Sequence, residues 1–214
     1  MTSHLQSLID RGVSAFASGN LNDALRCFQG AHNTISSTAG VHLPPEREEL
    51  YEQRLDVAPM SAPVEPVTDS LDYRCAFTVT SSRDHGIRER NIALCLAVLK
   101  YNTAITLQLQ GGDGNQRKAF RLYEESLRFL KELTCMEGFI TCVARLTIAC
   151  LHNMTIILFT NEVFEQASAF ITLSQQLLAL WSTSTQTPLW EHETEEFFSF
   201  LPLCEEMINS APAA

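Results

Sequence analysis

The stretch GVSAFASGNLNDALRCFQGA, residues 12 to 31, places small residues at regular intervals within a pattern that otherwise predicts helix. Apolar residues recur at helical spacing over residues 5–16 and again over residues 21–35, and Gly19 and Asn20 separate the two runs. Two helices can approach closely where small side chains on one face receive large side chains from the other. The sequence therefore predicts a tight helical hairpin near the N-terminus.

The positions of these residues match a known repeat. Counting from Gly12, the intervals to Gly19, Leu21, Ala24, Phe28 and Ala31 are 7, 9, 12, 16 and 19. This series resembles the tetratricopeptide repeat (TPR), which is a helix–turn–helix unit of 34 residues. The resemblance implies an all-α fold: a right-handed stack of about three antiparallel helical pairs and a C-terminal helix.

Weaker copies of the pattern occur further along the chain. One consists of Ala104, Gly111, Ala119, Tyr123 and Ser126, and another of Phe164, Ala167, Ile171 and Ser174. Any helical hairpin can use small and aromatic residues in this way, and that remains the alternative interpretation of these two pairs. Helices are expected over 87–110, 115–133, 138–160 and 163–181.

The resulting domain organisation is a single TPR-like domain over residues 1–209. Its parts are a first helical pair (1–36), an insertion (37–86), second and third pairs (87–181) and a capping helix (190–209), followed by a disordered tail (210–214). The insertion is foreign to the repeat pattern. It holds five of the eight prolines, and one short helix is expected over 46–55.

Within the insertion, Tyr73, Cys75, Phe77 and Val79 alternate with more polar or smaller residues, which is the period of an extended segment. An exposed apolar strand is a liability unless it is covered. We therefore expect residues 71–80 to lie on the inner helices near Asn102 and Asn153 and to occupy a groove there. The alternative is that the segment only covers an open helix edge.

Charge and cysteine content limit the function classes. The net charge of −10 comes from acidic flanking segments, and the middle of the chain is nearly neutral. The sequence therefore lacks a basic face for nucleic acid. The seven cysteines include no CxxC pair, and the N-terminus has no signal-peptide pattern. These features predict reduced thiols in the cytoplasm or the nucleus.

The segment from Phe139 to Thr160 is long and apolar enough to span a bilayer. However, Arg145, His152 and Asn153 would be costly in lipid. A central helix of a helical stack explains the same composition, so no membrane contact is expected.

Residues for chemistry are sparse. The six histidines do not pair with Cys, Asp or Glu at metal-ligand spacing, and the GGDG loop (111–114) lacks the Lys-Ser/Thr of a phosphate-binding loop. The basic residues of 115–133 alternate with glutamates, as on a solvated helix face. We therefore expect no enzymatic activity, no cofactor and no metal.

The TPR resemblance implies protein–protein interaction, as a scaffold or adaptor, through a concave face formed by the inner helices. The candidate partner-binding residues are Tyr101, Asn102, Arg145, His152 and Asn153, with Ile9 and Val13 beside them; the candidate groove segment contains Tyr73, Phe77 and Val79. Asn102 occupies one position of the clamp with which related domains grip chaperone C-termini, but the clamp's cations are missing, so those tails are not expected partners. The alternatives are a structural subunit of a larger helical assembly and a helical enzyme or small-ligand carrier.

Overall fold

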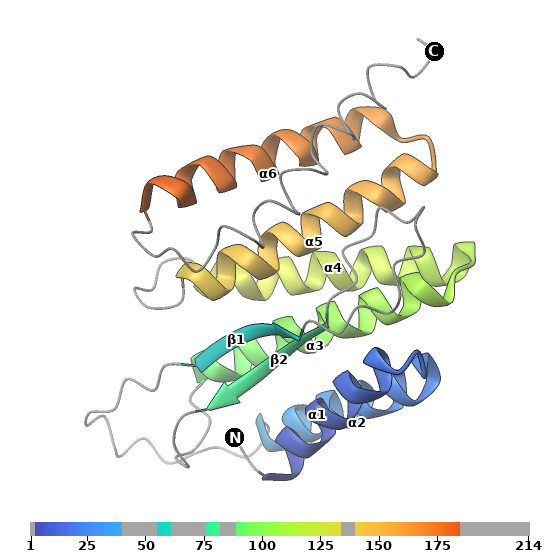
Figure 1. The fold of residues 1–214 in the computed structure, drawn as a ribbon, viewed down its shortest axis with the longest axis vertical. Helices are drawn as coiled ribbons and strands as arrows, with labels where there is room; N and C mark the ends of the chain where they lie inside the picture. Colours follow the sequence, from blue (N-terminus) through green and yellow to red (C-terminus); the bar gives the residue numbers. More distant parts are fainter. Residues whose placement is uncertain (1–2, 40–54, 61–75, 82–88, 134–139, 185–214) are drawn as a thin grey trace. The chain divides into compact units, whose positions relative to one another are not determined.

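The computed structural model describes residues 3–39, 55–60, 76–81, 89–133 and 140–184 (Figure 1). These residues form the helices α1 (Ser3–Ala17), α2 (Leu21–Ala39), α3 (Glu89–Gln110), α4 (Asp113–Leu133), α5 (Ile140–Thr160) and α6 (Phe164–Ser184), and the strands β1 (Leu55–Met60) and β2 (Ala76–Ser81). The prediction of a mostly helical fold is confirmed, with helix ends within about one turn of those expected. The predicted helix over 190–209 and the predicted tail lie outside the described residues.

The contacts within the chain divide it into two compact units. The first comprises Met1–Pro66 and Arg74–Leu146, and the second comprises Val67–Tyr73 and Thr147–Ala214. The single domain expected over residues 1–209 stays a prediction.

The first helical pair owes its close packing to Gly12. A Cβ atom at this position would lie 2.5 Å from a ring carbon of Phe28, so the ring occupies the space that any larger residue would need. Ala24, Phe28 and Ala31 are fully buried on the matching face of α2. Between the helices, Gly19 adopts a φ of +75°, the left-handed conformation that commonly ends a helix.

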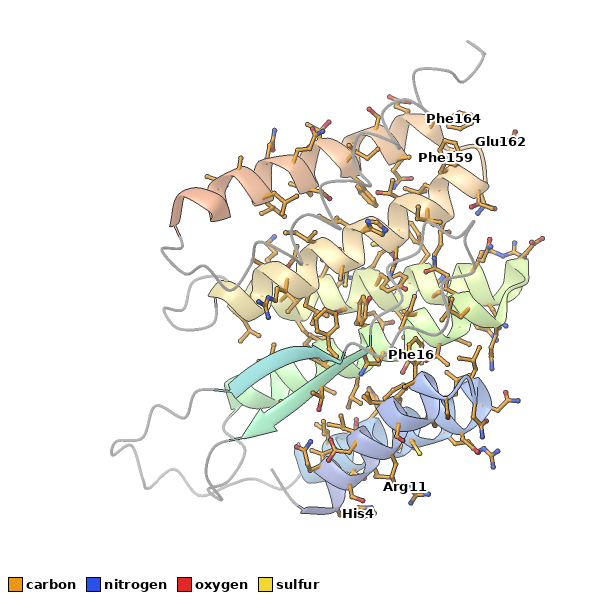
Figure 2. The ribbon with its side chains drawn as sticks, viewed as in Figure 1. His4, Arg11, Phe16, Phe159, Glu162 and Phe164 are labelled. Atoms are coloured by element: carbon orange, nitrogen blue, oxygen red, sulfur yellow. The ribbon has the colours of Figure 1, made fainter. Side chains whose placement is uncertain are left out.

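The opposite face of α1 is polar. Figure 2 shows Phe16 pointing into the unit, and His4 and Arg11 pointing away from it. Phe16 is buried, whereas His4 and Arg11 are exposed, as the helical spacing of the apolar residues predicts.

The second helical pair uses the corresponding positions. Ala119, Tyr123 and Ser126 of α4 are fully buried, and the Ser126 hydroxyl donates a hydrogen bond of 2.9 Å to the main-chain oxygen of Ala97 on α3. Gly111 and Gly112, both at positive φ, reverse the chain between the two helices. The predicted small-residue pattern therefore marks helix contacts in both pairs.

The helices of the first unit pack in chain order: α1 contacts α2, α2 contacts α3, and α3 contacts α4. A side-chain hydrogen bond from Gln110, at the end of α3, to Asn22, at the start of α2, joins the two pairs. The second unit holds α6 and most of α5. The chain reverses between them at Glu162, whose φ is +60°.

Aromatic contact supports this reversal. The rings of Phe159 and Phe164 meet edge to face with centroids 5.4 Å apart on either side of Glu162 (Figure 2). Further along α6, the buried residues Ala167, Ile171, Ser174 and Leu178 form one helical stripe. Three of them belong to the weak third copy of the repeat pattern.

Two helical segments, Ile92–Gln110 and Val143–Thr160, are long and apolar enough to cross a membrane by length and composition. The share of each segment that is buried inside the protein is 61% and 67%, respectively. Such burial is typical of core helices in soluble proteins, so the two segments are weak evidence for a membrane location.

The insertion differs from expectation at one point. Leu55, the last residue of the short helix expected over 46–55, is the first residue of β1. The remainder of that expected helix lies outside the described residues. The extended character of residues 76–79 is confirmed, because they lie in β2.

Candidate functional site

The two strands form an antiparallel hairpin within the first unit. In the register of the hairpin, Val57 is opposite Val79 and Pro59 is opposite Phe77. Strand β2 contacts both α1 and α3, which are the first helices of the two pairs (Figure 1). Strand β2 therefore bridges α1 and α3.

The centre of this contact is a double hydrogen bond between a side-chain amide and one residue of the strand. The main-chain N–H of Phe77 donates to Oδ1 of Asn102 at 2.9 Å, and Nδ2 of Asn102 donates to the main-chain oxygen of Phe77 at 2.7 Å. Asn102 is fully buried. An amide can satisfy both groups of one extended residue because it carries a donor and an acceptor side by side.

This bond also explains the residue on the opposite strand. Because both main-chain groups of Phe77 point to Asn102, they point away from β1, and the pair of Phe77 with Pro59 is a non-hydrogen-bonded one. Proline has no N–H to donate, so it fits this position without breaking the ladder. The Asn102 amide thus takes the place of a further strand along the outer edge of β2.

The side chain of Phe77 adds an aromatic contact. Its ring meets that of Tyr101 edge to face, with centroids 5.1 Å apart, and Tyr101 in turn contacts Tyr123 of α4 at 5.6 Å. The Tyr123 hydroxyl donates a hydrogen bond of 2.9 Å to the side chain of Gln108. Tyr101 therefore contacts an aromatic ring of β2 and one of α4.

Both faces of β2 are covered. Successive side chains of a strand point to opposite faces, and yet Ala76, Phe77, Thr78 and Val79 are all buried. The Thr78 hydroxyl lies 3.5 Å from a carboxylate oxygen of Asp10 on α1. Strand β2 thus has a polar contact with α1 as well as its bonds to Asn102 of α3.

Two of the residues predicted as a partner-binding site contact the strand. Tyr101 and Asn102 meet Phe77, as expected for the strand, and both are fully buried beneath it. In α5, His152 and Asn153 are buried in the second unit, and Arg145 is partly exposed. The expected contact of the strand with Asn153 stays a prediction, as does partner binding by these residues. Tyr73 lies outside the described residues.

Sequence reasoning missed the partner strand and the polar contact on α1. Leu55 and Val57 do alternate with Asp56 and Ala58, but Pro59 within the run argues against a strand. Asp10 carries no sequence signal beyond its place on α1, next to the predicted inner residue Ile9. The tertiary contact with Thr78 alone distinguishes it.

The remaining chemistry of the described residues is limited. Burial raises the pKa of the Cys95 thiol to about 12, so this cysteine keeps its proton at neutral pH. Cys27, Cys95 and Cys150 are free thiols. Within the described ranges, no three His, Cys, Asp or Glu side chains gather as a metal site would require. At the hairpin site, the Asn102 amide binds the main chain of an extended segment.

A scan against protein-family models found no match to this chain, and searches of curated proteins and of solved structures found no significant match either. The function must therefore be argued from the site itself.

Proposed function

We propose that the chain is a non-enzymatic protein–protein interaction module whose inner helices, α1 and α3, bind an extended peptide segment. The observation that carries this proposal is the double hydrogen bond between Asn102 and the main chain of Phe77. Main-chain recognition does not depend on the side chains of the bound segment. The same amide can therefore hold the backbone of a partner once β2 leaves.

The proposed architecture is a right-handed TPR-like stack. Three features support it: Phe28 packs against Gly12, the corresponding residues Ala119 and Tyr123 are buried in the second pair, and the helices of the first unit pack in chain order. In such a stack, the first helices of successive pairs line one concave face. β2 contacts the first helices of two pairs, which is where a bound peptide would lie.

In this proposal β2 occupies the peptide-binding groove of α1 and α3 when no partner is bound. The strand is tethered to the same chain, so its effective concentration is on the order of millimolar or above. A partner segment must therefore displace it, and an aromatic residue that replaces Phe77 against Tyr101 would help the partner to compete. The proposed location of this interaction is the cytoplasm or the nucleus, without nucleic acid, cofactor or metal.

The experiment uses the strand as its own test ligand. A labelled peptide of residues 73–81 (YRCAFTVTS, with Ser in place of Cys75) is added to the full chain carrying Phe77→Asp, and binding is followed by fluorescence anisotropy. The substitution places a charge in a buried aromatic site, so the internal strand is released. Hydrogen exchange at residues 76–81 verifies that release. We expect the peptide to bind this variant and to bind the wild-type chain much more weakly.

Two controls make the outcome specific. Adding Asn102→Ala to the Phe77→Asp chain removes two hydrogen bonds and should weaken peptide binding about tenfold or more. A peptide that itself carries Phe77→Asp should not bind. If the released variant fails to bind the wild-type peptide, the strand only covers a helix edge and the proposed receptor function is wrong.

A second candidate function is a structural subunit of a larger helical assembly. It is favoured by three large apolar side chains that are exposed in the second unit: Val163 (42%), Leu173 (42%) and Leu180 (68%). Leu173 and Leu180 are two helical turns apart and share one side of α6. A subunit of this kind would be obtained only in complex with its neighbours.

A further inference from the structure

A pocket of about 360 Å³ opens between α2, α3 and α4 in the first unit. This volume falls at the lower end of the range of roughly 300–1,000 Å³ that small-molecule sites occupy. The pocket is separate from the hairpin site, because neither Tyr101 nor Asn102 lines it.

Each of the three helices contributes side chains to the lining of the pocket. Leu107 and Leu122 supply apolar surface, His32 comes from α2, and the cations Lys100, Lys118 and Arg121 come from α3 and α4. Lys118 and Arg121 are exposed and lie three residues apart, on one face of α4. The pocket therefore combines an apolar wall with convergent positive charge.

The nearby carboxylate only partly compensates this charge. Glu125 of α4 forms an ion pair of 2.7 Å with Lys100. Glu125 thus pairs with Lys100, which is one of the three cations that line the pocket. In a chain with a net charge of −10, such a local excess of cations is unexpected on composition alone.

His32 experiences the same local field. Its pKa is lowered, first because burial disfavours the charged imidazolium and second because Lys100 repels it. A hydrogen bond with Asn33 and the charge of Glu125 act in the opposite direction. At neutral pH the imidazole is therefore uncharged, and its single N–H is used in the hydrogen bond with Asn33.

We propose that this pocket binds a small organic anion, a carboxylate or a phosphate monoester, attached to a short apolar body. The anionic group meets Lys100, Lys118 and Arg121, and the apolar body lies on Leu107 and Leu122. This inference does not depend on peptide binding by α1 and α3.

The ion pair with Glu125 provides an unusual test. A bound anion competes with Glu125 for Lys100, so removal of that carboxylate should strengthen binding. Removal of the other two cations should weaken it. Opposite effects of two substitutions on the same helix cannot arise from general destabilisation of that helix.

The probes are benzoate, phenyl phosphate and the uncharged benzyl alcohol, titrated into the full chain at low ionic strength. Binding is followed by NMR, through the backbone amides of the pocket and the pH titration of His32. We expect at least one anion to shift these signals and to raise the pKa of His32, because a nearby anion favours the imidazolium. Tighter binding of benzoate identifies a carboxylate ligand, and tighter binding of phenyl phosphate identifies a phosphate monoester.

The variants complete the experiment. Lys118→Gln combined with Arg121→Gln should weaken anion binding about tenfold, and Glu125→Gln should strengthen it about threefold, as expected for partly exposed charges. Arg117→Gln serves as the matched control on α4, because Arg117 does not line the pocket. Equal binding of benzyl alcohol, no shift at millimolar anion, or no response to the double substitution would overturn the proposal.

Discussion

Gly12 and Gly30 both lie inside helices, but the space around them differs. A Cβ atom at Gly12 would lie 2.5 and 2.7 Å from two ring carbons of Phe28, which is closer than real contacts allow. A Cβ atom at Gly30 would lie 3.7 Å from Leu8, which is an ordinary contact. At the residue scale, the first glycine is required by packing and the second is not.

This difference predicts that replacement by alanine changes the free energy of unfolding in opposite directions at the two glycines. Gly12→Ala should lower the free energy of unfolding by about 1–3 kcal/mol, because overpacking at Phe28 outweighs the gain in helix propensity. Gly30→Ala should raise it by about 0.5–1 kcal/mol, because alanine restricts the unfolded chain and meets no clash. Denaturant unfolding of both variants measures these values. Changes of the same sign would show that Gly12 does not set the approach of α1 and α2.

At the scale of helices, the small-residue pattern predicts where elements cross. Ala24, Ala119 and Ala167 lie on α2, α4 and α6, and each is fully buried. Their spacing predicts that they are equivalent, since each is followed by a large apolar residue four positions later. Residues four apart lie on the same face of a helix, so this pattern can be recognised in the sequence.

Replacing any of these alanines by leucine should therefore destabilise the protein. We expect Ala24→Leu, Ala119→Leu and Ala167→Leu each to lower the free energy of unfolding by about 1–3 kcal/mol through overpacking. The matched control is Ala169→Leu, because Ala169 is exposed on α6 only two residues from Ala167. Urea denaturation compares the four variants. Midpoints for all three buried substitutions equal to that of the control would contradict the assignment of helix crossings.

The hairpin is the part of the described structure that was hardest to predict from the sequence. Alternation identified β2, because one apolar face is visible in its residues. It did not identify β1, because Pro59 is acceptable there only if its position in the ladder needs no N–H. That condition depends on the register, which pairs Pro59 with Phe77, whose main-chain groups bond to Asn102. Neither the pairing nor the bond is visible in the sequence of β1 alone.

For the whole molecule, the main question is how two long apolar helices are accommodated. Ile92–Gln110 and Val143–Thr160 pass a composition test for membrane spans, but most of each window is buried inside the protein. Within the first, Asn102 and Thr106 are fully buried polar residues whose side chains are hydrogen-bonded to protein groups. Polar groups with protein partners suit a packed core, in which such groups must be satisfied.

We therefore expect the full chain to be obtained in aqueous buffer without detergent and as a folded protein on its own. Sedimentation velocity and circular dichroism of the detergent-free protein measure both properties. A chain that requires detergent would contradict the proposed location away from membranes. A chain that is soluble only with other subunits would favour the second candidate function, in which the exposed leucines of α6 are contact residues.

The sequence by itself determined the positions of the helices and the faces that they bury, because periodicity and the glycine turns are local properties of the chain. It also indicated that residues 76–79 are extended and need a covering surface. Only the tertiary structure decided which groups cover them. Asn102 could be singled out from its sequence position, but its bond to Phe77 and the pairing of Phe77 with Pro59 join residues far apart in the chain. The same holds for the pocket that His32 lines together with Lys118 and Arg121. Such contacts depend on how the helices pack, which local patterns do not encode.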